Sequence, residues 1–166
     1  MKYQIINIDN TSVLDLELVK NYIRIKSNED DFLIHNMIKT AIEFAENYLN
    51  IALYLKQIII IAESAIVELP VTPLLEISAI SINNSTIKDS EYELYKDSVI
   101  LKNSLSSEDR VKIEYQAGYQ KSANIPYPII TGMLLHIASM YDSRFGDVSP
   151  SQNILQLYNS YKKIRF

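Results

Sequence analysis

Few side chains in this sequence have the types and spacing that acid–base or metal chemistry requires. The two histidines, His35 and His136, fall in different segments that are expected to be helical. Asp31 stands one helical turn before His35, which is at best half of a metal site, and Lys39 follows one turn later. A lone histidine usually serves packing or the surface. One alternative function is a small hydrolase with a site built from His136 and Asp142, and the isolation of each histidine argues against it.

Known catalytic motifs are absent from the sequence. There is no G-x-S-x-G, no glycine loop that would bind phosphate and no H-E-x-x-H. The chain has no cysteine, which excludes disulfides, thiolate metal sites and a cysteine nucleophile. The acidic run at residues 29–31 suits the positive end of a helix dipole. We therefore expect no catalytic residue, no cofactor and no metal.

The C-terminal segment LYNSYKKIRF carries the most distinctive charge pattern. Tyr158 and Tyr161 form an apolar strip, and Lys162, Lys163 and Arg165 follow it. One interpretation is a helix end whose positive charges suit the dipole. The other is a docking tail, loose in the free chain, that folds against an acidic or phosphate-bearing partner with its aromatic residues as anchors.

Composition limits the remaining possibilities. The 166 residues are enough for one domain with a hydrophobic core. The formal net charge of −4 argues against a broad basic surface that binds nucleic acid. No apolar run is long enough to span a membrane, and the N-terminus lacks the apolar stretch of a signal peptide. We expect a protein that is made and kept in the cytoplasm, or assembled there, with no membrane partner.

The N-terminal part of the chain is expected to be helical over about residues 15–50. Asp15 is the expected N-cap of a short helix. Ser27 and Asp30 are spaced like a capping box at the start of a long one. The long helix has one apolar stripe: Ile34, Met37, Ile38, Ala41, Ile42, Ala45, Tyr48 and Leu49.

A small antiparallel β region is expected over about residues 55–117. Short β-branched runs alternate there with turn signals such as Asn-Asn-Ser at residues 83–85. Val111, Ile113 and Tyr115 alternate with polar residues, as in a strand with one buried face. Because the connections are short, we expect a single domain, residues 1–166.

Two more helices are expected, over about residues 127–145 and 150–164. Pro128 suits the first turn of the former, and Gly132 inside it is expected to let another backbone approach closely. Ser149 and Gln152 are spaced as a capping box for the latter. The expected fold class is α+β, mainly α, with helices at both ends flanking the β region.

Gly118, Pro126 and Pro128 crowd the connection between the last strand and the third helix. Glycine can take the positive φ that turns a chain sharply out of a strand. Each proline drives the residue before it into extended geometry. We interpret the three residues as a structural hinge that fixes the direction in which the helix leaves the β region.

Four short motifs follow one another along the chain: Leu16 and Lys20; Leu69, Pro70, Pro73 and Leu74; Tyr115, Ala117, Gly118 and Tyr119; Ile125, Pro126, Pro128 and Ile129. Together with the order of the expected elements, they resemble the head–tail connector (adaptor) proteins of long-tailed phages, prophages and gene transfer agents. The resemblance covers about residues 13–166, and one departure is Phe145, where relatives often carry a glutamate.

The resemblance implies a structural, ring-forming subunit in the virion. It would assemble as a ring, commonly of twelve, on the portal protein, and seat a tail-side connector or stopper protein. DNA would pass through the ring without specific binding. The protein would lie at the head–tail junction of the virion, and in the host cytoplasm during assembly. The resemblance also points to the portal as the partner of the docking tail, which would bind through these residues: Tyr158, Tyr161, Lys162, Lys163 and Arg165. The other open alternative is an oligomeric scaffold or regulatory adaptor unrelated to virions.

Overall fold

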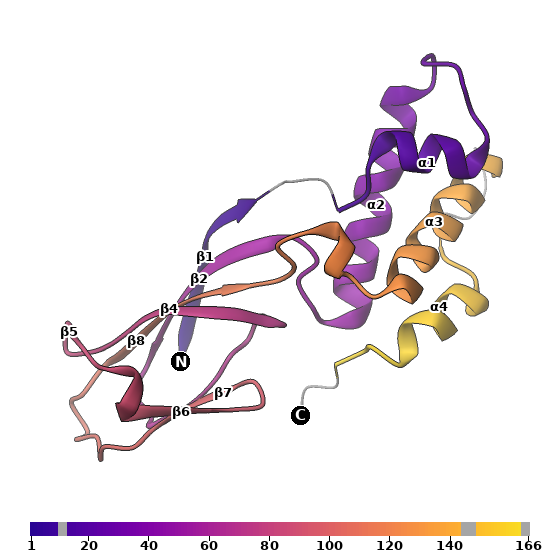
Figure 1. Cartoon of the computed structure of the whole chain (residues 1–166). Coiled ribbons are helices and arrows are strands. Elements are labelled where there is room, and N and C mark those ends of the chain that lie inside the picture. Colours follow the sequence, from indigo (N-terminus) through magenta and orange to yellow (C-terminus); the bar gives the residue numbers. More distant parts are fainter. Residues whose placement is uncertain (10–12, 144–148, 164–166) are drawn as a thin grey trace. The chain divides into compact units, whose positions relative to one another are not determined.

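A computed structural model describes residues 1–9, 13–143 and 149–163 of the chain (Figure 1). The chain divides into two compact units: a β unit of residues 1–10 and 54–120, and a helical unit of residues 11–53 and 121–166. The prediction of a single domain stays a prediction.

The β unit contains two antiparallel sheets. The five-stranded sheet has the order β1-β2-β8-β4-β5, and the three-stranded sheet has the order β3-β7-β6. The strands are β1 (Lys2–Asp9), β2 (Leu55–Ala62), β3 (Ile66–Glu68), β4 (Leu74–Ile82), β5 (Ser85–Thr86), β6 (Tyr92–Tyr95), β7 (Ser98–Leu101) and β8 (Val111–Ala117), with a short 3-10 helix, η1 (Asp89–Glu91).

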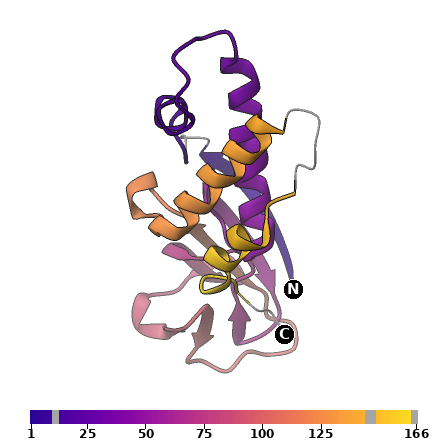
Figure 2. The ribbon, with the colours of Figure 1, turned by 90° about the vertical axis from the view of Figure 1, so that its right-hand side faces the viewer.

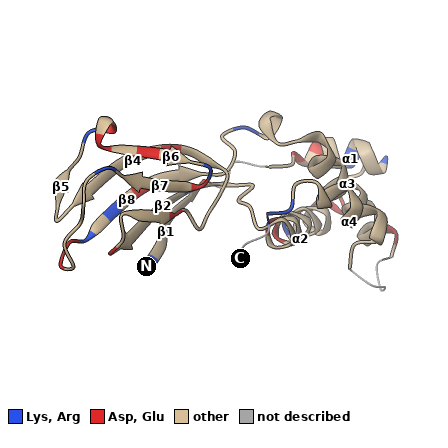
Figure 3. Ribbon diagram, turned by 90° about the horizontal axis from the view of Figure 1, so that it is seen from below, with Lys and Arg blue, Asp and Glu red and all other residues tan. Residues whose placement is uncertain are grey.

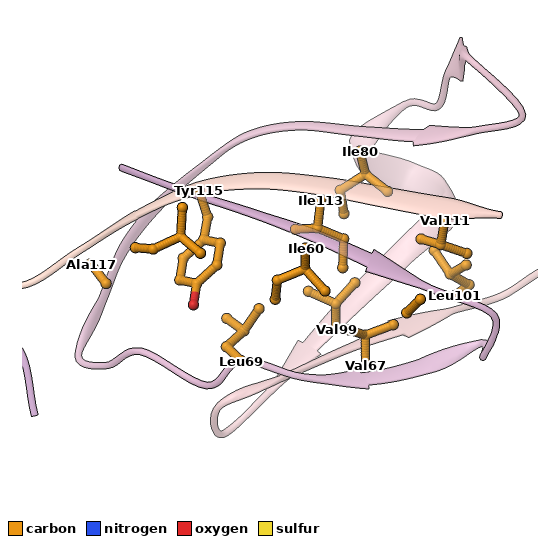
Figure 4. Close-up of a cluster of buried hydrophobic side chains, with 12 residues drawn as sticks. Ile60, Val67, Leu69, Ile80, Val99, Leu101, Val111, Ile113, Tyr115 and Ala117 are labelled. Carbon is orange, nitrogen blue, oxygen red and sulfur yellow. The ribbon is translucent and has the colours of Figure 1, made fainter. Parts of the chain in front are cut away.

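The core of the β unit lies where side chains of the two sheets meet (Figure 4). Strand β8 alternates strictly between buried and half-buried residues, as its sequence predicts. Tyr115 is fully buried, and its hydroxyl accepts a hydrogen bond of 3.1 Å from the amide of Val71. The expected turn between β4 and β5 is also present. Asn83 and Asn84 both have positive φ, which a tight hairpin turn requires.

Strand β1 corrects the expectation that helices occupy both ends of the chain. Residues Lys2 to Asp9 pair antiparallel with β2. Their alternation of polar and apolar residues is a strand signal, but Ile6 interrupts it because the strand bulges between Ile5 and Asn7. The expectation of a mainly α protein is likewise wrong, because helices take 37% and strands 29% of the residues that the structure describes. The α+β class itself is confirmed.

The helical unit contains α1 (Leu16–Ile23), α2 (Asp31–Leu49), α3 (Tyr127–Asp142) and α4 (Gln152–Asn159), with a short 3-10 helix, η2 (Ser122–Asn124). Helix α3 packs along α2, and α4 packs on α3 (Figure 2). The expected stripe of α2 is buried at Ile34, Ile38, Ala41, Ile42, Ala45 and Leu49.

The helix ends differ from the expected capping boxes. Asp15 accepts a hydrogen bond from the amide of Glu17 and so caps α1 as expected. Ser27 instead accepts one from the amide of Glu29, so the Ser27–Asp30 capping box does not form. Helix α4 has Ser151 as its N-cap and ends at Asn159, several residues short of the expected end.

Candidate functional site

His136 is a packing residue of the helical unit. Its side chain is only 1% exposed, and its ring meets the ring of Phe44 edge-on at 5.4 Å between centroids. Asp142 is exposed, and six residues along a helix is not a whole number of turns. The structure therefore does not bring together the pair on which the hydrolase alternative depends.

Asp31 binds a lysine and does not form a site with His35. The ammonium of Lys20 lies 2.7 Å from Asp31 Oδ1 and donates a second hydrogen bond of 2.6 Å to Asn28 Oδ1. The Lys20 side chain is 4% exposed, so this ion pair joins α1 to the start of α2 in a mostly buried setting. His35 is exposed on α2. Within the described residues, no group of three or more His, Asp or Glu is placed to hold a metal ion.

Asp30 is also engaged in structure. It accepts a 2.6 Å hydrogen bond from the hydroxyl of Tyr141, which joins the end of α3 to the start of α2. The acidic run at residues 29–31 thus contributes two of its carboxylates to contacts within the helical unit. Sequence pattern alone did not indicate these partners.

Tyr158 of the predicted docking tail is buried against α3. It is 0% exposed, and its ring occupies the space that Gly132 leaves open. A Cβ at Gly132 would lie 2.8 Å from Tyr158 Cζ and 3.0 Å from Oη. Burial raises the pKa of the Tyr158 hydroxyl above its ordinary value. The space beside Gly132 is therefore filled by the side chain of Tyr158, and not by a neighbouring backbone segment as expected from the sequence.

The segment after α4 is held along the end of α2. The amide of Lys163 donates to the carbonyl of Leu49 at 2.9 Å, and Asn50 Nδ2 donates to the carbonyl of Lys163 at 3.0 Å. The ammonium of Lys162 lies 4.1 Å from the centroid of the Tyr48 ring, which is a cation–π contact. The tail is therefore packed in this structure as far as residue 163.

The residues predicted to dock the portal differ in their exposure. Tyr158 is not at the surface of the helical unit, so it could anchor a partner only if α4 left its site. Tyr161 is 37% exposed and Lys162 is exposed, while Lys163 is half-buried. Docking through Tyr161, Lys162 and Lys163 stays a prediction, and Arg165 lies outside the described residues.

Gly118 has the backbone conformation expected of a hinge residue. Its φ is +106°, and its amide donates a 2.9 Å hydrogen bond to the carbonyl of Pro73. A Cβ there would lie 2.8 Å from the carbonyl carbon of Tyr54. Pro126 is the N-cap of α3 and Pro128 stands in its first turn. The hinge role of these three residues stays a prediction.

The β unit also carries an apolar strand at one edge of its larger sheet. All eight residues of β1 are exposed, including Tyr3 at 51%, Ile5 at 38% and Ile8 at 42%. Tyr3 and Ile5 pair with the buried Ile60 and Ile58 of β2, so they lie on the face that bears the core. Periodicity could have revealed this strand, but nothing in the sequence indicated that it would remain exposed.

Among the described residues, both units carry charges of both signs. The ribbon of each unit contains both acidic residues (red) and basic residues (blue) (Figure 3). On β8, Lys112 and Glu114 lie 2.6 Å apart as an ion pair. None of the described helices is both long and apolar enough to cross a membrane.

Comparisons with known proteins place these features in a family. A family model described as head completion protein matches residues 12–135. A chain from the neck of an empty gene transfer agent (GTA) particle, computed with C6 symmetry, has a TM-score of 0.77 and 14% identity; the match covers 100% of this chain and 97% of that chain. A chain from the virion of a native GTA particle has a TM-score of 0.75, with the same identity and coverage.

A further match comes from the neck of a native GTA particle computed with C12 symmetry, at a TM-score of 0.71, 14% identity and the same coverage. The comparison with curated proteins found no match. The same fold therefore recurs over the full length of this chain.

Proposed function

Because this chain belongs to the head completion protein family, we propose that it is a structural head–tail connector that assembles as a ring between the portal of a capsid and the tail. The observation that carries the proposal is the joint match of the family model to residues 12–135 and of the fold to neck chains over the whole length. The C6 and C12 symmetries under which those necks were computed are consistent with a ring.

The proposed role is structural and not enzymatic. The best candidate base, His136, is buried against an aromatic ring, and the best candidate metal ligand, Asp31, is bound to Lys20. Both groups therefore already serve packing or an ion pair. Ring assembly needs shape and complementary surfaces, which such contacts help to hold rigid.

Deletion of the gene tests the proposal directly. We expect capsids without attached tails, and free tails, in lysates of the deletion strain viewed by electron microscopy. Expression of the wild-type chain from a plasmid should restore tailed particles, and its tagged form should label the neck. Normal numbers of tailed particles in the deletion strain would contradict the proposal.

The ring would conduct DNA without binding it. The net charge of −4 and the mixing of both signs on each unit disfavour the many phosphate contacts that make binding tight. We expect no measurable binding of duplex DNA at physiological salt in a fluorescence anisotropy titration. Sub-micromolar affinity would contradict a passive conduit.

Docking to the portal is proposed to use the surface formed by Tyr161, Lys162 and Lys163. Replacing both lysines by glutamate should reduce attachment of the chain to portal-bearing capsids, because the charge of that surface reverses. The double variant Lys26→Glu with Lys39→Glu is the matched control, since it also reverses two charges, at exposed positions of the helical unit outside the tail. Equal attachment of the tail variant and the control would remove the tail from the portal interface.

A further inference from the structure

The larger sheet of the β unit has a free edge at each end. At one end, no described strand pairs with the outer side of β1. At the other end, β5 pairs only with Ser81 and Ile82, so residues 74–79 of β4 also lack a described strand on their outer side. Free edges present unpaired backbone groups and are sites where another chain can add a strand.

We propose that β1 of one copy pairs with residues 74–79 of β4 in the neighbouring copy, so that the larger sheets of adjacent subunits join into one sheet around the ring. This inference rests on the ring assembly proposed above and names the surface that would build it. The partner is a second copy of this chain, because the two free edges belong to one sheet and complement each other in direction and in apolar pattern.

Strand direction favours this head-to-tail contact. Strands β1, β2, β8 and β4 are each antiparallel to the next, so β4 runs opposite to β1. In a ring of many subunits, adjacent copies are related by a small rotation, so the β1 of the next copy keeps nearly the direction of the first. Its pairing with β4 is therefore antiparallel, as every pair within the sheet already is.

The apolar pattern of the two edges also matches. On the core-bearing face, β1 presents Ile5 and Ile8, three residues apart because of its bulge. On the same face, β4 presents Leu74 and Ile77, also three residues apart because of a bulge. In antiparallel register Ile5 meets Ile77 and Ile8 meets Leu74.

Pairing would also explain why β1 carries exposed apolar residues. Ile5 and Ile8 are 38% and 42% exposed, while Leu74 and Ile77 are partly buried and pack against the core cluster of the β unit. Beside the β4 of a neighbour, the apolar face of β1 would continue that neighbour's core. On the opposite face the same register sets Asn7 against Glu76 and Gln4 against Ala79, so no like charges oppose each other.

Cysteine cross-linking tests the register. The chain has no cysteine of its own, so introduced thiols are the only ones present. One purified chain carries Gln4→Cys and a second carries Ala79→Cys; the two are mixed at high concentration, oxidised and run on a non-reducing gel. Oxidation traps each encounter permanently, so weak pairing accumulates as a disulfide-linked dimer.

We expect the yield of mixed dimers of Gln4→Cys with Ala79→Cys to be several-fold higher than the yield of Gln4→Cys with either of two control variants, Glu76→Cys and Gln116→Cys. Glu76→Cys tests a shifted register on the same edge. Gln116→Cys lies on β8, which is paired on both sides, and should react only by chance collision. Equal yields from all three partners, or dimers formed by Gln4→Cys alone, would overturn the proposal, the latter because it indicates an isologous β1–β1 contact.

A single chain that carries both Gln4→Cys and Ala79→Cys separates this proposal from the proposed function. Strands β1 and β4 are three strand spacings apart, about 14 Å. A disulfide requires that the Cα atoms of its two cysteines lie within about 7 Å, so the two introduced cysteines of this variant cannot be linked within one chain. In purified particles we expect a ladder of linked chains. Necks that contain the chain without this ladder would overturn the edge pairing and leave the connector role intact, whereas absence of the chain from necks would overturn the role itself.

Discussion

Gly132 and Tyr158 form a contact whose stability effect has an unusual sign. In an ordinary helix interior, Gly→Ala stabilises by about 1 kcal/mol because it reduces backbone freedom. Here the added Cβ would lie 2.8 Å from Tyr158 Cζ, whereas carbon atoms settle at about 3.5–4.0 Å. The ring would have to move by roughly 1 Å, and it is fully buried.

We therefore expect Gly132→Ala to destabilise the helical unit. Overpacking a filled site costs about 1–3 kcal/mol, and the helix gain of about 1 kcal/mol offsets part of it. The net loss is therefore up to about 2 kcal/mol. Far-UV circular dichroism during urea unfolding reports this unit, because it contains the helices. Thr131→Ala, at the exposed neighbouring position of α3, is the control and should change stability by less than about 0.5 kcal/mol.

A second background makes the reasoning refutable. Tyr158→Leu removes the ring atoms that the new Cβ would meet, because leucine ends at its Cδ atoms. In that background Gly132→Ala should stabilise by up to about 1 kcal/mol, so its effect reverses sign. If Gly132→Ala has the same effect in both backgrounds, the two side chains do not compete for the same space.

Three further predictions concern single contacts. Gly118→Ala should destabilise the β unit by at least about 2 kcal/mol in chemical unfolding, because its positive φ and the nearby Tyr54 carbonyl leave no place for a Cβ; a smaller loss would mean that the turn relaxes. Asp31→Ala should lower the free energy of unfolding by about 1–3 kcal/mol, less than the loss of a fully buried pair because Asp31 is 34% exposed. Adding Lys20→Met should recover part of that loss in the same assay, because it removes the buried ammonium that Asp31→Ala leaves without its carboxylate. A double variant less stable than Asp31→Ala would contradict this explanation. Tyr158→Phe should leave stability at neutral pH equal or up to about 1 kcal/mol higher, because the buried hydroxyl has no hydrogen-bond partner among the described residues. Burial raises the folded pKa of Tyr158, so its unfolded form loses the proton first and wild-type stability falls as pH rises above about 10; Tyr158→Phe should fall less steeply, and parallel pH profiles would contradict this.

Local periodicity accounts for what the sequence predicted well. The buried stripe of α2 and the strict alternation of β8 follow from which residues share one face of a helix or strand. The turn at Asn83 and Asn84 and the positive φ of Gly118 follow from backbone sterics at single residues. These features need only neighbours within a few positions, so the sequence by itself determined them.

Contacts between distant segments were decided by the tertiary structure. Nothing in the basic, aromatic pattern of the tail indicates that Tyr158 fills the space above Gly132, 26 positions earlier in the chain, and is buried while Tyr161 is not. Likewise, the pattern around Lys20 does not reveal that α2 brings Asp31 to its ammonium. Burial of a side chain depends on which other surface covers it, and one segment's residue order carries no record of that surface. The same reason explains β1: its alternation marks it as a strand, but only the order of strands in the sheet makes it an exposed edge.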